Sequence, residues 1–185
     1  QQRRSAQSAM LIILDAMTRL LAPILSFTAE EIWLSLPARQ GKEISVHLTQ
    51  FPEIDREHVD ATLAQNWSKM IALKGEISKA IELARKNKVV GHSLDAGVDI
   101  SASGDLRAFL EAHLEDLRTI LIVSDISIIE KDVIKDPYAS PEFVGLTIGV
   151  RKTRGKKCDR CWVYSETVGV NDEHPAICER CLANL

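Results

Sequence analysis

The segment "KCDRCWVYSETVGVNDEHPAICERC", from Lys157 to Cys181, contains all four cysteines of this 185-residue chain. They form two Cys-x-x-Cys pairs, which could make two disulfides, a redox pair or a metal site. Disulfide frameworks suit small secreted domains, whereas this chain is long enough to bury a core and its first residues, "QQRRSAQSAM", do not resemble a secretory signal. A redox pair would account for one Cys-x-x-Cys but not for the second.

Zinc accounts for both pairs. Each Cys-x-x-Cys directs two thiolates at one point, and two such turns complete a tetrahedral shell with Zn–S distances of about 2.3 Å. The 16 residues between Cys161 and Cys178 are within the usual spacing of zinc ribbons. We therefore predict one structural Zn²⁺, because four thiolates leave no open position for water; free or redox thiols remain the alternative. The predicted ligands are Cys158, Cys161, Cys178 and Cys181, and His174 is interpreted as a surface residue.

The tail around these cysteines has too few apolar residues to form a core alone. Its sizeable apolar side chains are Trp162, Val163, Tyr164, Val168, Val170 and Ile177. We expect metal binding to supply most of its folding free energy, on the order of 10 kcal/mol or more.

A basic run, "RKTRGKK", immediately precedes the first cysteine, although the whole chain has a net charge of −3. Cations bind phosphates and an exposed aromatic ring stacks on an unpaired base, so this pattern indicates nucleic-acid binding. Two alternatives remain open: the cations balance the formal −2 charge of zinc with four thiolates, and the tryptophan covers the metal. The predicted nucleic-acid contacts are Arg151, Lys152, Arg154, Lys156, Lys157, Arg160 and Trp162.

The predicted fold class is α+β: a helical bundle fragment, then a small α/β module and a C-terminal four-cysteine zinc knuckle. In residues 1–60, apolar spacing predicts helices over residues 1–36, interrupted at Pro23, with Thr28 and Glu31 spaced as a capping box. The stripe on the first helix consists of Met10, Leu11, Leu14, Met17, Thr18 and Leu21. Two helices cannot close a core, so we expect this part to have been cut from a larger helical bundle.

Residues 61–150 are predicted to form the α/β module, and residues 151–185 the zinc-binding tail. After a short extended stretch, "ISVHLTQFPEID", a long helix is expected from about Asp60 to Asn87. Strands are expected at "AGVDISA", "SDISIIE" and "VGLTIGVRKT", and a helix at "GDLRAFLEAHLEDLRTIL". The buried face of the long helix is predicted to be Leu63, Trp67, Met70 or Ile71, Ile77, Ile81 and Ala84. The basic residues of this segment lie largely off that face, and they are interpreted either as a solvated face or as contacts to RNA phosphates. They are Lys69, Lys79, Arg85, Lys86 and Lys88.

Catalytic patterns are missing from the sequence. It contains no phosphate-binding glycine loop, no recognisable Ser/His/Asp or Cys/His set, and no transmembrane run. His113, in the middle of a predicted helix, is interpreted as structural. The sequence thus favours a binding module without catalytic residues of its own.

Three motifs together resemble the C-terminal end of bacterial isoleucyl-tRNA synthetase. They are "LLAPILSFTAEEIW", "KAIELARKNKVVGHSLDA" and "KCDRCWVY…HPAICERCLANL", and with the segments between them they cover essentially the whole chain in the family's order. The first motif also occurs in valyl and leucyl relatives, so the zinc tail selects the isoleucyl branch.

The resemblance implies a part of the enzyme that attaches isoleucine to its tRNA with ATP. The family's His-Ile-Gly-His and Lys-Met-Ser-Lys-Ser signatures are absent, so the chain is expected to be non-catalytic, with ATP used only in the missing catalytic domain. The implied partners are the anticodon stem-loop of isoleucine tRNA and the remainder of the synthetase. Arg160 and Trp162 are expected at the anticodon-facing tip, in a cytoplasmic, monomeric protein that does not contact membrane.

Two other protein classes remain as alternatives. Formamidopyrimidine-DNA glycosylases carry a similar zinc finger, but they begin with a proline followed by glutamate, whereas this chain begins "QQRR". A helix–two-turn–helix element should also precede their finger, and strands are predicted here instead. The second alternative is a free-standing zinc-ribbon adaptor that binds protein.

Overall fold

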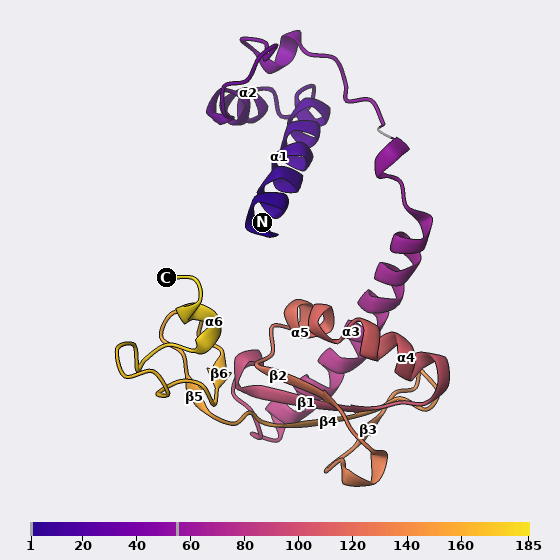
Figure 1. The fold of residues 1–185 in the computed structure, drawn as a ribbon. Coiled ribbons are helices and arrows are strands. Elements are labelled where there is room, and N and C mark those ends of the chain that lie inside the picture. The colour runs from indigo at the N-terminus through magenta and orange to yellow at the C-terminus, as the bar shows by residue number, and fades with distance from the viewer. Residues whose placement is uncertain (1, 55) are drawn as a thin grey trace. The chain divides into compact units, whose positions relative to one another are not determined.

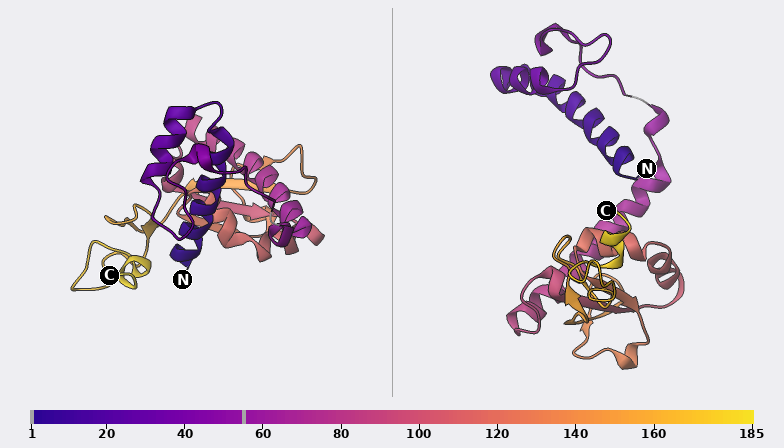
Figure 2. Two further views of the ribbon diagram at one scale, coloured as in Figure 1. Left: turned by 90° about the horizontal axis from the view of Figure 1, so that it is seen from above. Right: turned by 60° about the vertical axis from the view of Figure 1, so that its left-hand side comes forward.

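The computed structural model describes residues 2–54 and 56–185 and divides into two compact units, Gln1–Asp60 and Ala61–Leu185 (Figure 1). The first unit is helical and the second combines helices with a small sheet, which confirms the predicted α+β class. The second unit contains both the α/β module and the cysteine-rich tail (Figures 1 and 2). Within the described residues, no helix has the length and apolarity needed to cross a membrane.

The first unit is built from two helices and two short 3-10 turns. Helix α1 spans Gln2–Leu21 and α2 spans Ser26–Ser35, with η1 at Val46–Leu48 and η2 at Arg56–His58. Pro23 lies in the turn between the helices, as predicted. Trp33 anchors a small core, and its indole nitrogen donates to the carbonyl of Glu43 at 2.8 Å. The other members of this core are Ala22, Ala29, Leu36 and Val46.

Two local predictions in this unit are wrong. The capping box of Thr28 and Glu31 is absent, because α2 begins at Ser26, with Leu25 at the N-cap position and no side-chain cap. The expected extended stretch instead contains η1, since Glu30 accepts hydrogen bonds from the Ser45 hydroxyl and the main chain of Val46, each at 2.9 Å. A tertiary contact with Glu30 thus holds a turn where an extended stretch was expected.

The apolar stripe of α1 is largely exposed. Met10 is 68 % exposed and Met17 is 51 % exposed, while Thr18 is buried with its hydroxyl bonded to the carbonyl of Leu14. This exposure agrees with the expectation that two helices cannot close a core by themselves.

The module of the second unit has a four-stranded sheet with helices on one face. Its helices are α3 (Ala61–Lys86), α4 (Gly104–Ala112) and α5 (Leu114–Leu121), with 3-10 turns η3 (Ser93–Asp95) and η4 (Lys131–Val133). The strands are β1 (Ala96–Ser101), β2 (Asp125–Ile128), β3 (Tyr138–Ala139) and β4 (Thr147–Lys152), in the order β2-β1-β4-β3. Strands β1 and β2 are parallel, whereas β4 is antiparallel to β1 and β3. Buried residues of α3, α4 and α5 pack in one core against this sheet.

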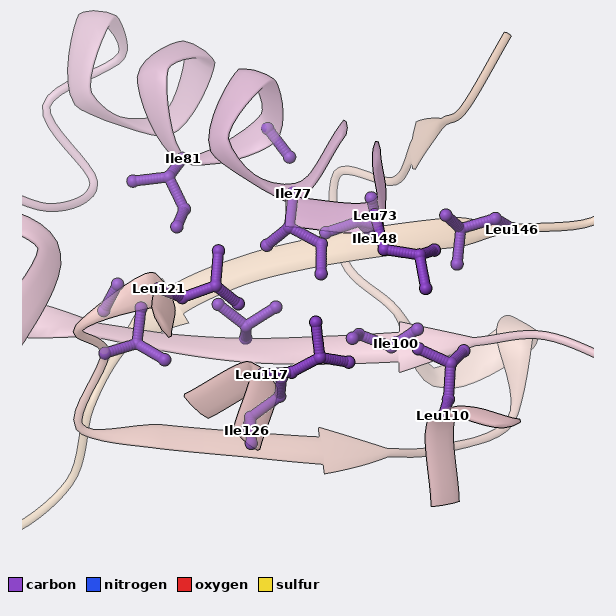
Figure 3. Close-up of a cluster of buried hydrophobic side chains, with 14 of the residues drawn as sticks. Leu73, Ile77, Ile81, Ile100, Leu110, Leu117, Leu121, Ile126, Leu146 and Ile148 are labelled. Carbon is purple, nitrogen blue, oxygen red and sulfur yellow. The ribbon is translucent and has the colours of Figure 1, made fainter. Parts of the chain in front are cut away.

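Strand alternation places the core on the helix side of the sheet. Val98 and Ile100 of β1, Ile126 of β2 and Ile148 of β4 pack with Leu73, Ile77 and Ile81 of α3 and with Leu110, Leu117 and Leu121 (Figure 3). The opposite face is polar or lacks side chains, with Gly97, Asp99 and Arg151 in adjacent positions.

The long helix differs from its prediction over its first turns. Leu63 and Trp67 are 53 % and 41 % exposed, so burial begins only at Met70; Ile71, the alternative, is also exposed. This part of α3 extends beyond the sheet (Figure 1). The predicted helix over residues 104–121 is interrupted at His113, whose ring packs in a tilted arrangement against Phe109 at a centroid distance of 4.5 Å.

Candidate metal centre

The four cysteines converge within the tail. A hairpin of β5 (Lys156–Lys157) and β6 (Tyr164–Ser165) carries the first pair, and the second pair begins at the N-cap of α6 (Glu179–Leu182). The four Sγ atoms lie within 4.8 Å of one another, and those of Cys161 and Cys178 are 3.7 Å apart. A tetrahedral zinc site with Zn–S bonds of about 2.3 Å requires S···S distances of about 3.8 Å. The thiol cluster therefore fits Zn²⁺, and four thiolates would give it a closed, structural shell.

The main chain shapes each turn around the thiols. The Trp162 nitrogen donates to the Cys158 carbonyl at 2.8 Å, and Trp162 has a φ of 64°, in the left-handed region. The Cys178 nitrogen donates to the Cys158 Sγ atom at 3.3 Å, which links the two pairs. Gly155 has a φ of 86°, and a Cβ there would lie 2.3 Å from the main chain of Ser165. Only glycine fits this approach to β6.

Two thiols have strongly shifted proton affinities. Burial opposes ionisation of Cys158, but hydrogen bonds from the main chain of Cys161, Cys178 and Arg160 outweigh it and lower its pKa to about 6. Burial, together with hydrogen bonds from the neighbouring thiols, raises the pKa of Cys181 to about 12. Coordination of a metal ion by Cys181 would therefore require release of its proton.

Arg180 is a member of the site that the sequence reasoning missed. A hydrogen bond to Cys161 and the neighbouring Cys178 and Cys181 raise the pKa of Arg180, so this guanidinium lies beside the thiol cluster. A signal for it exists in the sequence, because both pairs have the pattern Cys-acidic-Arg-Cys, "CDRC" and "CERC".

Trp162 is 61 % exposed, and the Lys157 ammonium lies 5.3 Å from its ring centroid. Lys152, Arg154 and Lys156 are also exposed. These five side chains are thus accessible on the second unit.

The remaining two predicted contacts are used within the protein. Arg160 donates to the carbonyls of Cys181 at 2.7 Å and Asn184 at 3.0 Å, which fixes the last turn of the tail. Arg151 bridges Asp99, at 2.9 Å, and Asp125 on the open face of the sheet. A Cβ at Gly97 would lie 2.4 Å from this guanidinium, so the glycine makes room for it.

The tail is attached to the module by a polar junction. The Tyr164 nitrogen donates to the Ser124 hydroxyl at 2.8 Å, and this hydroxyl donates to the Leu94 carbonyl at 2.6 Å. A hydrogen bond to Asp95 raises the pKa of Tyr164. The Thr153 nitrogen donates to the Asp95 carbonyl at 2.8 Å. No periodicity or spacing in the sequence marks these residues, so sequence reasoning did not find them.

His174 stays outside the metal cluster. Its side chain is exposed, and its main-chain nitrogen donates to the Asn171 side chain at 2.9 Å. The four thiols are the group within the described residues that can hold a metal ion, and His174 is not among them.

Comparisons with known proteins agree with this arrangement. Residues 1–100 match the model of the anticodon-binding domain of tRNA ligase, and residues 155–184 match the zinc finger found in FPG and IleRS. The description of the zinc-finger model names two protein families, FPG and IleRS. The model that matches residues 1–100 is described for tRNA ligases, and this match argues against the glycosylase alternative.

Curated relatives extend the match over the whole chain. The isoleucine–tRNA ligase of Geobacter sulfurreducens is 45 % identical over 183 residues, which is 98 % of this chain and 19 % of that protein. The ligase of Syntrophotalea carbinolica is 44 % identical over 99 % of this chain and 19 % of its own length. The ligase of Caldanaerobacter subterraneus is 39 % identical over 100 % of this chain and 20 % of its own. The chain spans about one fifth of the length of these relatives. It belongs to the anticodon-binding domain family of tRNA ligases, and its tail is a four-cysteine zinc finger of the type found in isoleucine–tRNA ligases.

Proposed function

We propose that this chain is the tRNA-binding C-terminal part of an isoleucine–tRNA ligase, which attaches isoleucine to its tRNA with ATP. The observation that supports the proposal is the continuous match to such ligases over 98 % of the chain, with the helical and finger regions in the same order. The chain itself contributes no catalytic residue; adenylate formation belongs to the remainder of the parent enzyme. Its partners are isoleucine tRNA and that remainder, in a cytoplasmic, monomeric enzyme.

Its contribution is to hold the anticodon stem-loop. Trp162 is exposed, and the turn formed by Cys158 and Cys161 fixes the direction of its side chain. An aromatic ring so presented can stack on an unpaired anticodon base, which is worth roughly 1–3 kcal/mol. The zinc supplies the rigidity that an apolar core would supply elsewhere.

The basic run surrounds this ring with phosphate-binding charge. Lys152, Arg154, Lys156 and Lys157 are exposed and serve as the phosphate contacts. Arg151 and Arg160 support them indirectly, because their guanidinium groups are used by carboxylates and carbonyls of the protein.

The test is filter binding of the zinc-loaded chain to isoleucine tRNA and to a version with a swapped anticodon. The chain should prefer the native anticodon, and Trp162→Ala should weaken binding about tenfold or more while zinc stays bound. Trp67→Ala is the matched control, since this tryptophan is also partly exposed but lies on α3, and it should bind normally. Normal binding by a zinc-loaded Trp162→Ala variant would place recognition elsewhere.

A salt titration separates stacking from charge. Lys156→Ala combined with Lys157→Ala should weaken binding to all RNA sequences and make the dependence of log K on log salt shallower. Trp162→Ala should leave that slope nearly unchanged. The chain alone should not exchange pyrophosphate with ATP in the presence of isoleucine; adenylate formation by the pure chain would contradict its non-catalytic role.

A further inference from the structure

The zinc finger and the module do not share an apolar core. Among the described residues, the buried cluster of the finger and that of the module have no member in common. A hollow of about 820 Å³ is lined by Tyr164 and Glu166 of the finger and by Asp125 and Gly149 of the sheet. Because apolar packing does not fix the finger on the module, its orientation depends on the polar contacts beside this hollow.

Ser124 makes one of these contacts from the module side. Its side chain is buried, and it lies directly before β2. Its hydroxyl accepts a hydrogen bond from the main-chain nitrogen of Tyr164 at 2.8 Å and donates to the Leu94 carbonyl at 2.6 Å. Its own main-chain nitrogen donates to the Ala96 carbonyl at 3.2 Å. One hydroxyl thus joins the finger to the turn η3, while the main chain of the same residue is held against β1.

Asp95 makes the second contact from the same turn. Its carboxylate accepts the hydroxyl of Tyr164, so this tyrosine is held by both its main chain and its side chain. Its carbonyl accepts the main-chain nitrogen of Thr153 at 2.8 Å. Thr153 lies in the link of residues 153–155 between β4 and β5. Both the link and the hairpin are therefore attached to one short segment of the module.

These attachments are coupled to Trp162 through the hairpin. The Cys158 nitrogen donates to the Val163 carbonyl at 3.0 Å, and the Trp162 nitrogen donates to the Cys158 carbonyl at 2.8 Å. Tyr164 follows directly on this hydrogen-bonded turn. Since the chain from Trp162 to Tyr164 is held internally, a rotation of the hairpin on the module also moves the Trp162 ring.

We propose that Ser124 and Asp95 are positioning residues, which fix the orientation of the finger and thereby the direction in which Trp162 faces RNA. This inference rests on the proposed function and extends it to a buried residue, Ser124, that does not itself contact RNA. Loss of either attachment lets the finger adopt several orientations, and RNA binding must then order it at a cost in conformational entropy.

The experiment removes the two attachments separately in the zinc-loaded full chain. Ser124→Ala removes the hydroxyl that holds the main chain of Tyr164, and Tyr164→Phe removes the hydroxyl that bonds to Asp95. Ser127→Ala is the matched control, because Ser127 lies on β2 beside the same hollow and its hydroxyl makes no hydrogen bond to another described residue. Filter binding to isoleucine tRNA is measured over a range of salt concentrations, with zinc content and thermal melting checked for each variant.

The expected result is weaker binding without loss of a phosphate contact. Ser124→Ala and Tyr164→Phe should each weaken binding about two- to tenfold, which corresponds to one net hydrogen bond. Zinc content and the slope of log K against log salt should equal those of the wild type, because neither variant removes a cation. Ser127→Ala should bind as the wild type does. Binding by both junction variants that equals that of Ser127→Ala would overturn the positioning role.

A double-mutant cycle with Trp162→Ala separates positioning from a general structural effect. If the junction acts through the ring, Ser124→Ala should cost little further binding in a chain that already carries Trp162→Ala. Additive losses would overturn the proposal, because they would show that the junction affects binding independently of Trp162. If Ser124→Ala lowers zinc content or thermal melting, the cycle with Tyr164→Phe decides in the same way.

The outcome for the wild type separates this inference from the proposed function. If the wild-type chain does not bind tRNA, both fail. If it binds and Trp162→Ala weakens it, but Ser124→Ala and Tyr164→Phe behave as Ser127→Ala does, the proposed function stands and the positioning role is wrong.

Discussion

The α/β module and the zinc tail of the second unit are stabilised in different ways. The module has a continuous apolar core contributed by α3, α4, α5 and three strands. The buried cluster of the tail consists of Cys158, Cys178, Cys181 and Val168, with Cys161 and Ile177 packed against it. The module is therefore stabilised by apolar area removed from water, at about 25 cal/mol per Å², whereas the buried groups of the tail are mainly metal ligands.

This difference explains what each region can present to a partner. A core-forming segment must turn its large side chains inward, and the module does so with Leu73, Ile77 and Ile100. The tail leaves Trp162 exposed because the metal, and not this ring, organises the chain around it. We therefore expect that loss of the metal unfolds the tail but not the module, and that truncation of an apolar side chain in the module core does not release the metal.

The largest expected effect is loss of the tail on removal of one ligand. Cys158→Ser should release zinc and disorder residues 155–185, because the metal supplies most of the folding free energy there, on the order of 10 kcal/mol. The module should keep its secondary structure. The zinc stoichiometry measures whether the tail keeps its metal. The chemical-shift dispersion of the amide NMR signals shows which of the two regions stays folded. Val170→Ser, at an exposed position in the same tail, should retain zinc; unfolding of the module along with the tail in Cys158→Ser would contradict the comparison.

The reverse experiment truncates the module core. Leu73 is fully buried on α3, so Leu73→Ala should destabilise the module by about 2–5 kcal/mol through lost burial and the cavity left behind. Leu83→Ala, on the same helix but 46 % exposed, should cost much less. Denaturant unfolding followed by circular dichroism measures both. Below the unfolding transition, zinc content should equal that of the wild type, and zinc loss from native Leu73→Ala would show that the two regions are not separable.

The tail could be read from the sequence because its fold depends on few residues at fixed spacing. Four cysteines in two pairs specify the metal ligands, and their convergence within 4.8 Å agrees with that prediction. Strands β1, β2 and β4 were also predictable, since alternation such as that of Val98 and Ile100 gives the buried face directly, whereas the two-residue β3 was not predicted. The cysteine spacing and the strand alternation are both local patterns, and the predicted strand bounds lie within a few residues of the observed ones.

Tertiary contacts explain what the sequence did not show. Leu63 and Trp67 fit the helical period of α3, yet they are exposed, because that part of the helix extends beyond the sheet. Periodicity identifies a face but not the length over which it is covered. Arg151 lies in a basic run that indicates RNA, but strand register places it beside Asp99 and Asp125. Registers between distant strands are not encoded in the composition of one segment.

A buried carboxylate gives the module an acid sensitivity. Glu76 of α3 has no exposed surface and accepts hydrogen bonds from Lys79, Ser140 and Tyr138. These bonds, that of Lys79 first, lower the pKa of Glu76. A carboxylate whose folded pKa lies below its unfolded value of about 4.3 contributes stability that is full above that value and is lost as pH falls through the folded pKa.

Glu76→Gln should therefore destabilise the module at about pH 7 and cost progressively less below about pH 4. The reason is that the wild type loses the same charge on acidification. Thermal melting of both proteins across this range measures the difference, and Glu115→Gln, at an exposed carboxylate, is the control and should change little at any pH. A destabilisation by Glu76→Gln that stays constant with pH would show that packing, and not the carboxylate charge, stabilises this position.

The smallest effect is expected at the junction between the two regions. Tyr164→Phe removes the hydroxyl that bonds to Asp95 but leaves the main-chain bond from Tyr164 to Ser124. Zinc should stay bound and module melting should barely change, because neither the thiols nor the apolar core is altered. The pKa of Asp95 should rise, since burial would then be opposed only by its bonds to His92 and Gly91. Carbon-detected NMR titration of this carboxyl measures the shift.

Amide exchange in Tyr164→Phe should also become faster in the β5–β6 hairpin than in β1, because the tail is held to the module by fewer bonds. An unchanged Asp95 titration would mean that the hydroxyl is not part of the junction, and equal acceleration in both strands would mean that the metal-built and core-built regions open together.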